Sequence, residues 1–180
     1  MITLITGGQR SGKSTFAETL LKDYNDVVYF ATAEMRRDDT EFLERIQTHK
    51  ARRNKAWRTV ECYKDFHRYF GTESHYIVDC VTNAVSRFMF EFTAGKTEIR
   101  KQDCNAIFLA IQKTFSELID SVRQRHAHLI LVSNEVGSAT VPMNALARCF
   151  VDLQGMCNSF LAQKADTVYL CVAGIPLKIK

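Results

Sequence analysis

The sequence contains little proline and no long apolar run. Only two of its 180 residues are proline, and no stretch rich in proline, glycine or serine divides it, which argues against a linker between domains. No apolar run approaches the roughly 20 residues of a membrane helix. Residues 1–6 lack the basic leader and long apolar core of a signal peptide. We therefore expect one domain over residues 1–180, in the cytoplasm, without an integral membrane segment.

The sequence also lacks any cysteine pair at C-x-x-C spacing and any large excess of charge. The missing spacing argues against a zinc or dithiol site of that type, and the formal net charge is only +4. Basic residues gather around Arg52 and Arg53 instead of spreading along the chain, which favours a local anionic ligand over a nucleic acid. We expect six buried free thiols, at Cys62, Cys80, Cys104, Cys149, Cys157 and Cys171.

Short β-branched runs alternate with stretches of helical periodicity. The runs cover residues 2–6, 27–32, 76–81, 129–133 and 167–172. Such alternation predicts an α/β fold, with a mostly parallel central sheet flanked by helices on both faces. Residues 174–180 follow the last run after a short turn and predict an antiparallel C-terminal edge strand. The polar residues 93–103 predict a loop before a helix over about 105–125.

The most specific motif is a phosphate-binding loop (P-loop) at residues 7–14. It fits G-x-x-x-x-G-K-[ST] and stands between an apolar strand and a helix. Backbone N–H groups of such a loop point at phosphate oxygens, beside the positive end of the helix dipole. Lys13 would reach the β and γ phosphates, and Ser14 would hold Mg²⁺. The loop consists of Gly7, Gly8, Gln9, Arg10, Ser11, Gly12, Lys13 and Ser14.

A P-loop needs a carboxylate near its metal ion, and two strands could supply one. Asp79 ends the run at 76–79, whereas Asn134 and Glu135 follow the run at 129–133. We favour Asp79 because it lies directly at the strand end. The predicted metal ligands are thus Ser14 and Asp79.

The kind of P-loop protein is narrowed by what surrounds the loop. Asn54-Lys55 is the only Asn-Lys pair, and Trp57 stands where a guanine-reading acid would be expected, so a signalling GTPase is disfavoured. A small-molecule kinase or a nucleotidyltransferase remains. His49 lies on the apolar face of a helix predicted over 38–53. It is either a core histidine or, beside the basic cluster, a nucleophile toward phosphorus.

Several blocks of the chain, in order, resemble one known family. They are residues 6–14, Tyr-Phe-Ala-Thr-Ala at 29–33, Arg-Ile-Gln-Thr-His-Lys at 45–50, Trp-Arg-Thr-Val-Glu at 57–61, Asp-Cys-Val-Thr-Asn at 79–83, Ser-Asn-Glu-Val-Gly at 133–137, Val-Pro at 141–142 and the ending at 172–179. Over nearly its whole length the sequence resembles the bifunctional adenosylcobinamide kinase/adenosylcobinamide-phosphate guanylyltransferases of cobalamin biosynthesis.

The resemblance implies a RecA-like P-loop fold, a homotrimer, a corrinoid substrate, GTP and ATP as nucleotide substrates, and Mg²⁺. It implies phosphorylation of adenosylcobinamide, followed by GMP transfer through a covalent GMP-histidine intermediate, with His49 and Lys13 as the catalytic residues. Glu61 could read guanine N1–H and the 2-amino group. The nucleotide-binding positions implied are residues 7–14, Thr32, Ala33, Glu34, Lys50, Ala51, Arg52, Arg53, Glu61 and Asp79.

The sequence departs from the family pattern at three positions. Asp79 stands where relatives often have glutamate, and Met143 and Val151 stand where relatives often have charged residues. Two other functions stay open at this point: a simple P-loop kinase with a structural His49, and a nucleotide-binding regulatory protein without turnover. His126 and His128 lack a third ligand, and we expect both to be exposed loop residues.

Overall fold

Seven strands form one sheet in the order β3-β2-β4-β5-β1-β6-β7. The computed structural model describes residues 1–33, 47, 51, 53–94 and 100–180. All neighbouring strands are parallel except β6 and β7, which are antiparallel. The strands are β1 (Ile2–Gly7), β2 (Val27–Ala31), β3 (Arg58–Glu61), β4 (His75–Asp79), β5 (His128–Val132), β6 (Thr167–Val172) and β7 (Ile175–Lys178).

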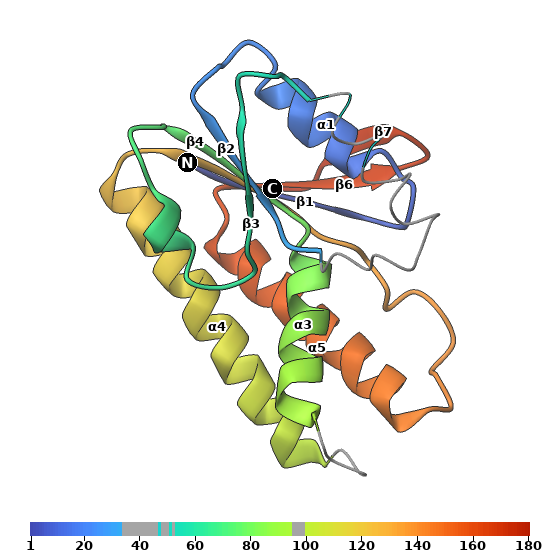
Figure 1. The fold of residues 1–180 in the computed structure, drawn as a ribbon. Helices are drawn as coiled ribbons and strands as arrows, with labels where there is room; N and C mark the ends of the chain where they lie inside the picture. The colour runs from blue at the N-terminus through green and yellow to red at the C-terminus, as the bar shows by residue number, and fades with distance from the viewer. Residues whose placement is uncertain (34–46, 48–50, 52, 95–99) are drawn as a thin grey trace.

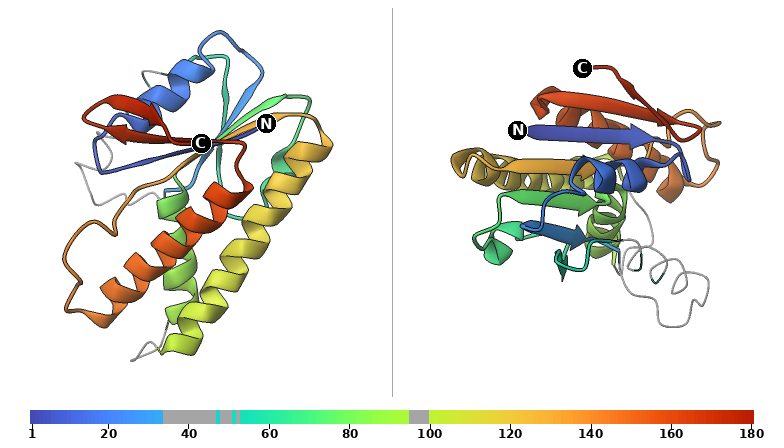
Figure 2. Two further views of the ribbon diagram at one scale, coloured as in Figure 1. Left: turned by 180° about the vertical axis from the view of Figure 1, so that it is seen from behind. Right: turned by 90° about the horizontal axis from the view of Figure 1, so that it is seen from above.

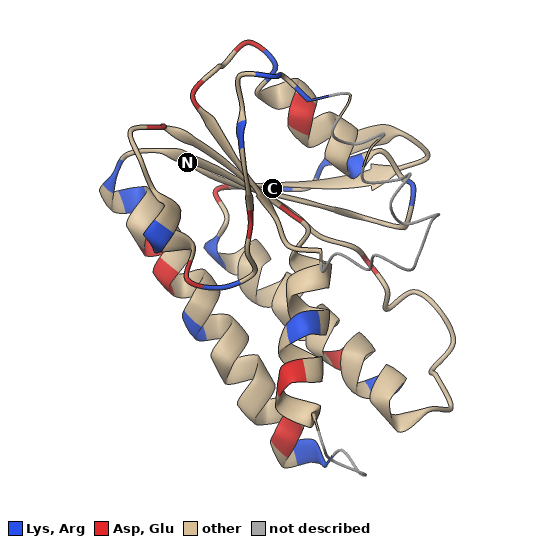
Figure 3. Ribbon diagram, viewed as in Figure 1, with Lys and Arg blue, Asp and Glu red and all other residues tan. Residues whose placement is uncertain are grey.

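Helices cover the sheet unequally (Figures 1 and 2). Helix α1 (Lys13–Leu20) lies on one face, while α3 (Val81–Thr93), α4 (Lys101–Gln124) and α5 (Ala145–Lys164) cover the other. A short 3₁₀ helix, η1 (Phe66–Tyr69), precedes β4. None of the described helices is long and apolar enough to cross a bilayer. Figure 3 shows Lys and Arg distributed over elements of both layers.

The core has two parts because strand side chains alternate between the faces. Leu4 and Val78 pack under the three helices, whereas Ile5 and Ile77 pack under α1. Every residue of β1 is buried. A strand buried on both faces reads as a continuous apolar run, which is why β1 could be predicted from sequence.

The expected parallel sheet and antiparallel edge strand are confirmed, but several boundaries are wrong. Residues 76–81 are not one strand, because β4 ends at Asp79 and α3 begins at Val81. The polar stretch at 93–103 is not all loop, since α4 begins at Lys101, where Asp103 Oδ2 accepts a hydrogen bond from the Arg100 N–H (2.9 Å). Strand β3 was not expected, and the helix expected over 38–53 lies mostly outside the described residues.

Two predictions about cysteine and histidine are corrected. Cys104 and Cys149 form a disulfide between α4 and α5, with Cα atoms 6.3 Å apart, because these helices pack side by side. The other four cysteines are buried free thiols as expected. His128 is not an exposed loop residue: it begins β5, is half-buried, and its Nε2 lies 3.1 Å from Thr3 Oγ1.

Candidate functional site

The sheet register brings most of the predicted site residues to one edge. Ala31 lies opposite both Glu61 and Asp79 on the strands beside it, and Asp79 lies opposite Val132. The P-loop leaves the same end of β1. Because these strands are parallel, all their carboxyl ends meet at this edge, where α/β sheets bind ligands.

The P-loop is shaped by two glycines and buttressed by the last two strands. Gly7 has φ +149°, and a Cβ there would lie 2.3 Å from the carbonyl oxygen of Cys171 in β6. Gly12 has φ +90°, and a Cβ there would lie 3.3 Å from Gly174 Cα. The Gly174 N–H also donates to the Ser11 carbonyl (3.2 Å). The β6–β7 turn therefore forms one wall of the loop.

Lys13 is folded into this loop. Its side chain is buried, and Nζ donates to the Gly8 carbonyl (2.5 Å) and to Ser11 Oγ (3.4 Å). Burial lowers the pKa of Lys13, whereas nearby Cys80, Cys171 and Asp79 oppose that shift. Phosphate oxygens would favour the charged ammonium in the same way as Asp79 does. The loop thus encloses the amino group of Lys13.

Asp79 is linked to Arg53 through a buried tyrosine. The Tyr29 hydroxyl donates to Asp79 Oδ2, and no described residue donates to Oδ1. The guanidinium carbon of Arg53 lies 3.4 Å from the centroid of the Tyr29 ring. Burial, with Asp79 beside it, raises the pKa of Tyr29 well above its usual value, so the hydroxyl stays protonated and donates.

The remaining predicted residues are distributed between this edge and the part of the chain that is not described. Thr32 is buried, and its hydroxyl donates to the Cys80 carbonyl (2.6 Å), with Ala33 next to it. Glu61 is exposed at the end of β3, four strands from β1. With strands about 4.8 Å apart, that is roughly 19 Å. Four residues lie outside the described residues, namely Glu34, His49, Lys50 and Arg52.

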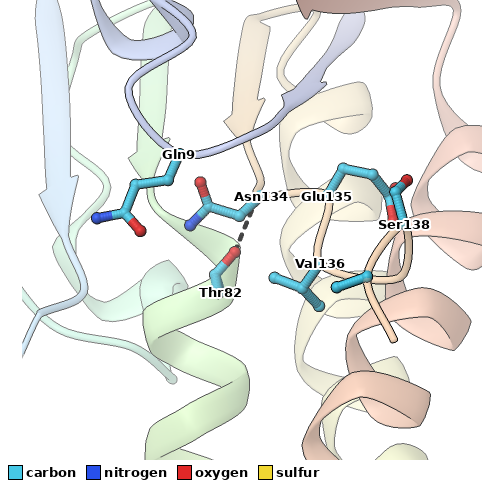
Figure 4. Close-up of a pocket in the computed structure, with 7 residues that line it drawn as sticks. Gln9, Thr82, Asn134, Glu135, Val136 and Ser138 are labelled. Atoms are coloured by element: carbon cyan, nitrogen blue, oxygen red, sulfur yellow. Dashed lines mark hydrogen bonds between the residues drawn. The ribbon is translucent and has the colours of Figure 1, made fainter. Parts of the chain in front are cut away.

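A pocket of about 530 Å³ opens beside the P-loop (Figure 4). It is lined by Gln9, by Thr82 at the start of α3 and by the segment after β5, including Asn134 and Glu135. The backbone N–H of Glu135 donates a hydrogen bond to the Gly7 carbonyl at the start of the P-loop (2.9 Å). The Thr82 hydroxyl accepts from the Asn134 N–H (2.8 Å). Two loops and one helix start are therefore held together around the pocket.

The buried side chain of Asn158 holds the segment that lines the pocket. Asn158 of α5 donates to the Asn134 carbonyl (3.0 Å) and to Glu135 Oε2 (3.4 Å). Its Oδ1 accepts from Ser133 Oγ (2.6 Å) and from Gln154 Nε2 (2.9 Å). Glu135 Oε1 accepts from the Gly137 N–H (3.0 Å). Glu135 is thus engaged within its own loop, which leaves Asp79 as the better placed carboxylate for a metal ion.

Sequence reasoning gave no role to Tyr29, Asn158 or Gly174. A tyrosine in an otherwise apolar buried strand signals that its hydroxyl has a partner, so Tyr29 could have been noticed. Asn158 and Gly174 offered no comparable signal, because their partners lie far away along the chain.

Comparisons with known proteins place the sequence in a family. Residues 3–179 match the family model for cobinamide kinase/cobinamide phosphate guanyltransferase. The chain is 39% identical over 184 residues to the bifunctional adenosylcobalamin biosynthesis protein CobU of Salmonella typhimurium, and 38% identical to that of Escherichia coli, with the full length of each chain covered. The related CobP of Pseudomonas aeruginosa is 31% identical over 185 residues, covering 100% of this chain and 98% of CobP.

The fold is that of RecA-like P-loop proteins. A KaiC-like protein from Pyrococcus horikoshii matches with a TM-score of 0.54 and 17% identity, covering 94% of this chain and 69% of that one. This likeness concerns the fold alone, whereas the sequence matches cover both chains almost from end to end. The chain belongs to the cobinamide kinase/cobinamide phosphate guanyltransferase family.

Proposed function

We propose that this enzyme phosphorylates adenosylcobinamide and then transfers GMP from GTP to adenosylcobinamide phosphate, giving adenosylcobinamide-GDP and pyrophosphate. The observation that carries the proposal is the arrangement of one sheet edge, where the buried Lys13 of the P-loop lies near Asp79, and Asp79 is joined through Tyr29 to Arg53. Membership of a family described by both activities supports it. ATP or GTP would donate the phosphate in the first reaction.

We assign residues 7–14 to the triphosphate and Asp79 with Ser14 to Mg²⁺. Asp79 fits such an ion because its carboxylate ends β4 near Lys13, and because no described residue donates to its Oδ1. Mg²⁺ is commonly held by one or two protein oxygens together with phosphates and waters, so a larger ligand cluster is not required. When bound, the ion would neutralise charge on the phosphate oxygens.

Guanylyl transfer would use His49, which lies outside the described residues. A neutral imidazole nitrogen attacks the α-phosphorus of GTP, the bond to the bridging oxygen breaks, and pyrophosphate leaves with that electron pair. Lys13 and Arg53 would stabilise the charge on pyrophosphate. A phosphate oxygen of adenosylcobinamide phosphate then attacks the same phosphorus and releases His49. Thr32, Ala33, Glu34, Lys50, Ala51 and Arg52 complete the proposed nucleotide contacts.

The two reactions need two positions of the nucleotide. The kinase step presents the γ-phosphorus to a hydroxyl, whereas guanylyl transfer presents the α-phosphorus to His49. Glu61 lies about four strand spacings from β1, roughly 19 Å. Only the base end of a nucleotide could approach Glu61 while its phosphates stay near the P-loop. We therefore assign Glu61 to guanine.

Labelling with α-³²P-GTP tests the proposal. We expect acid-labile, alkali-stable label on the protein, absent in His49→Ala and kept in His67→Ala, a matched change at an exposed histidine of η1. The label should pass to adenosylcobinamide phosphate when that compound is added. If the protein phosphorylates adenosylcobinamide with γ-labelled nucleotide yet never takes up α-label, it is a simple kinase. Nucleotide binding without either transfer would identify a regulatory protein.

A further inference from the structure

We infer that Tyr29 is a positioning residue that orients both the metal-side carboxylate of Asp79 and the guanidinium of Arg53. The inference deepens the proposed function, because it takes the assignments of Asp79 and Arg53 from it. Tyr29 itself contacts neither the nucleotide nor the ion in this proposal. It acts through its two neighbours.

The position of Tyr29 explains how one side chain can contact both Asp79 and Arg53. It lies in β2 on the α1 face of the sheet, is 1% exposed, and packs in the cluster that includes Ile77 and Ala17. Strand β2 pairs with β4, with Tyr29 opposite Ile77 and Ala31 opposite Asp79. Tyr29 and Asp79 therefore project from the same face of neighbouring strands, two register positions apart. The hydroxyl then points toward the carboxyl edge of the sheet.

The hydrogen bond to Asp79 restricts a torsion that is otherwise loose. The terminal torsion of aspartate is broad because it joins sp³ and sp² carbons. With Oδ2 accepting from the Tyr29 hydroxyl, the carboxylate plane is fixed. No described residue donates to Oδ1, so this oxygen remains for the ion. A short aspartate cannot adjust its reach as a glutamate can, and the fixed orientation therefore matters more here.

The ring of Tyr29 gives Arg53 a second constraint. The guanidinium carbon lies 3.4 Å from the ring centroid, a cation–π contact. The Arg53 side chain is only 10% exposed, and its Nε lies 4.0 Å from Glu18 Oε1 on α1. Its Nη1 donates to Thr59 Oγ1 of β3 (3.4 Å). The guanidinium is thus held between the sheet and α1 instead of extending freely into solvent.

The two contacts can be separated by substitution. Tyr29→Phe removes the hydroxyl and keeps the ring, whereas Tyr29→Leu removes both. Tyr76→Phe is the matched control: Tyr76 is equally buried, and its hydroxyl donates to the Glu73 carbonyl (2.7 Å) away from the P-loop. Binding of a fluorescent GTP analogue, measured with Mg²⁺ and again with EDTA, reports on each contact without requiring turnover.

For Tyr29→Phe we expect the gain in nucleotide affinity from Mg²⁺ to fall by about tenfold, the loss typical of a hydrogen bond to a charged group. Affinity in EDTA should stay within about twofold of wild type. Tyr76→Phe should change neither. In an Asp79→Asn background, Tyr29→Phe should have no further effect, because the tyrosine acts through that carboxylate.

Arg53→Ala reports on the ring. In EDTA, Arg53→Ala should weaken nucleotide binding by the same factor in the wild-type protein and in Tyr29→Phe, because both keep the aromatic ring. In Tyr29→Leu the loss of affinity should be several-fold smaller, because the ring that supports Arg53 is already absent. Melting temperatures measured by circular dichroism would identify any variant that fails to fold.

The inference is overturned if Tyr29→Phe and Tyr76→Phe behave alike, or if Tyr29→Phe still weakens binding in the Asp79→Asn background. It is equally overturned if Arg53→Ala weakens nucleotide binding in EDTA by the same factor in wild type, Tyr29→Phe and Tyr29→Leu. Absence of α-label on the wild-type protein would contradict the proposed guanylyl transfer but would leave these binding results interpretable, so the two failures are distinguishable.

Discussion

At the scale of single residues, the P-loop depends on Gly7, because strand β6 occupies the space that a side chain at this position would need. A Cβ on Gly7 would lie 2.3 Å from the Cys171 carbonyl oxygen, at φ +149°. We expect Gly7→Ala to lower the free energy of unfolding by about 1–3 kcal/mol or more and to abolish nucleotide binding. Urea unfolding without nucleotide measures the first effect.

Gly8→Ala is the control for this prediction. A Cβ on Gly8 would meet nothing within 4 Å, so its unfolding free energy should stay within about 0.5 kcal/mol of wild type. Equal losses in the two variants would show that general backbone freedom, not the contact with β6, explains the glycine at position 7.

A second residue-scale prediction concerns pH. Burial lowers the pKa of His128 from 6.5 to about 4; the N-terminal amine and His75 act in the same direction, and Asp166 opposes them. The folded state thus favours the neutral imidazole. The resulting stability is complete above pH 6.5 and is lost as the pH falls toward 4. We expect the melting temperature to fall over this range, and less steeply in His128→Gln.

His126→Gln provides the comparison for the pH profile, because His126 is exposed. Its melting temperature should follow the wild-type curve. A His128→Gln curve parallel to wild type between pH 4 and 6.5 would contradict the assignment of the acid sensitivity to His128.

At the scale of elements, α5 and the segment after β5 are joined by Asn158. This side chain is 8% exposed and bonds to four groups, including the Asn134 carbonyl and Ser133 Oγ. Replacing it by leucine would leave buried polar partners unpaired, at a cost of about 1–3 kcal/mol. Urea unfolding of Asn158→Leu should show this loss. Ser159→Ala, a change at an exposed position on the same helix, should unfold as wild type does.

Elements were predictable where the signal is local. Strand β1 and the helix after residues 7–14 are confirmed, because a fully buried strand is a continuous apolar run and the loop motif between them is contiguous in sequence. Strand β3 was missed since it has no fully buried residue. The start of α4 was missed because a polar first turn, capped by Asp103, reads as loop.

The candidate site likewise has parts that could be predicted from local sequence and parts that depend on contacts between distant residues. That residues 7–14 and Asp79 lie at the same edge of the sheet could be predicted from sequence, because the loop leaves one apolar strand and Asp79 ends another. The contact between Tyr29 and Asp79 could not, since it joins residues 50 positions apart and depends on how β2 pairs with β4. The disulfide was missed for the same reason: its cysteines are 45 positions apart and meet only through the packing of α4 on α5.

At the scale of the whole molecule, we predict a homotrimer. The family resemblance implies it. At the edge of the sheet, β7 and the residue that follows it expose apolar side chains, with Ile175 62%, Leu177 50% and Ile179 62% exposed, as association surfaces do. Light scattering coupled to gel filtration should give about three times the chain mass of 20.6 kDa. A single species at one chain mass, at all concentrations tested, would contradict the prediction.

The position of β1 in the sheet also determines when the site can form during synthesis. Among the described residues, strand β1 pairs with β5 and β6 alone, and the walls beside Gly7 and Gly12 come from Cys171 and Gly174. A nascent chain that has exposed the phosphate motif therefore has neither a strand to pair with it nor the turn that shapes it. If the proposed nucleotide site is correct, such a chain would complete it only after residue 174 has left the ribosome, so GTP would stabilise the finished fold and would not template its early stages.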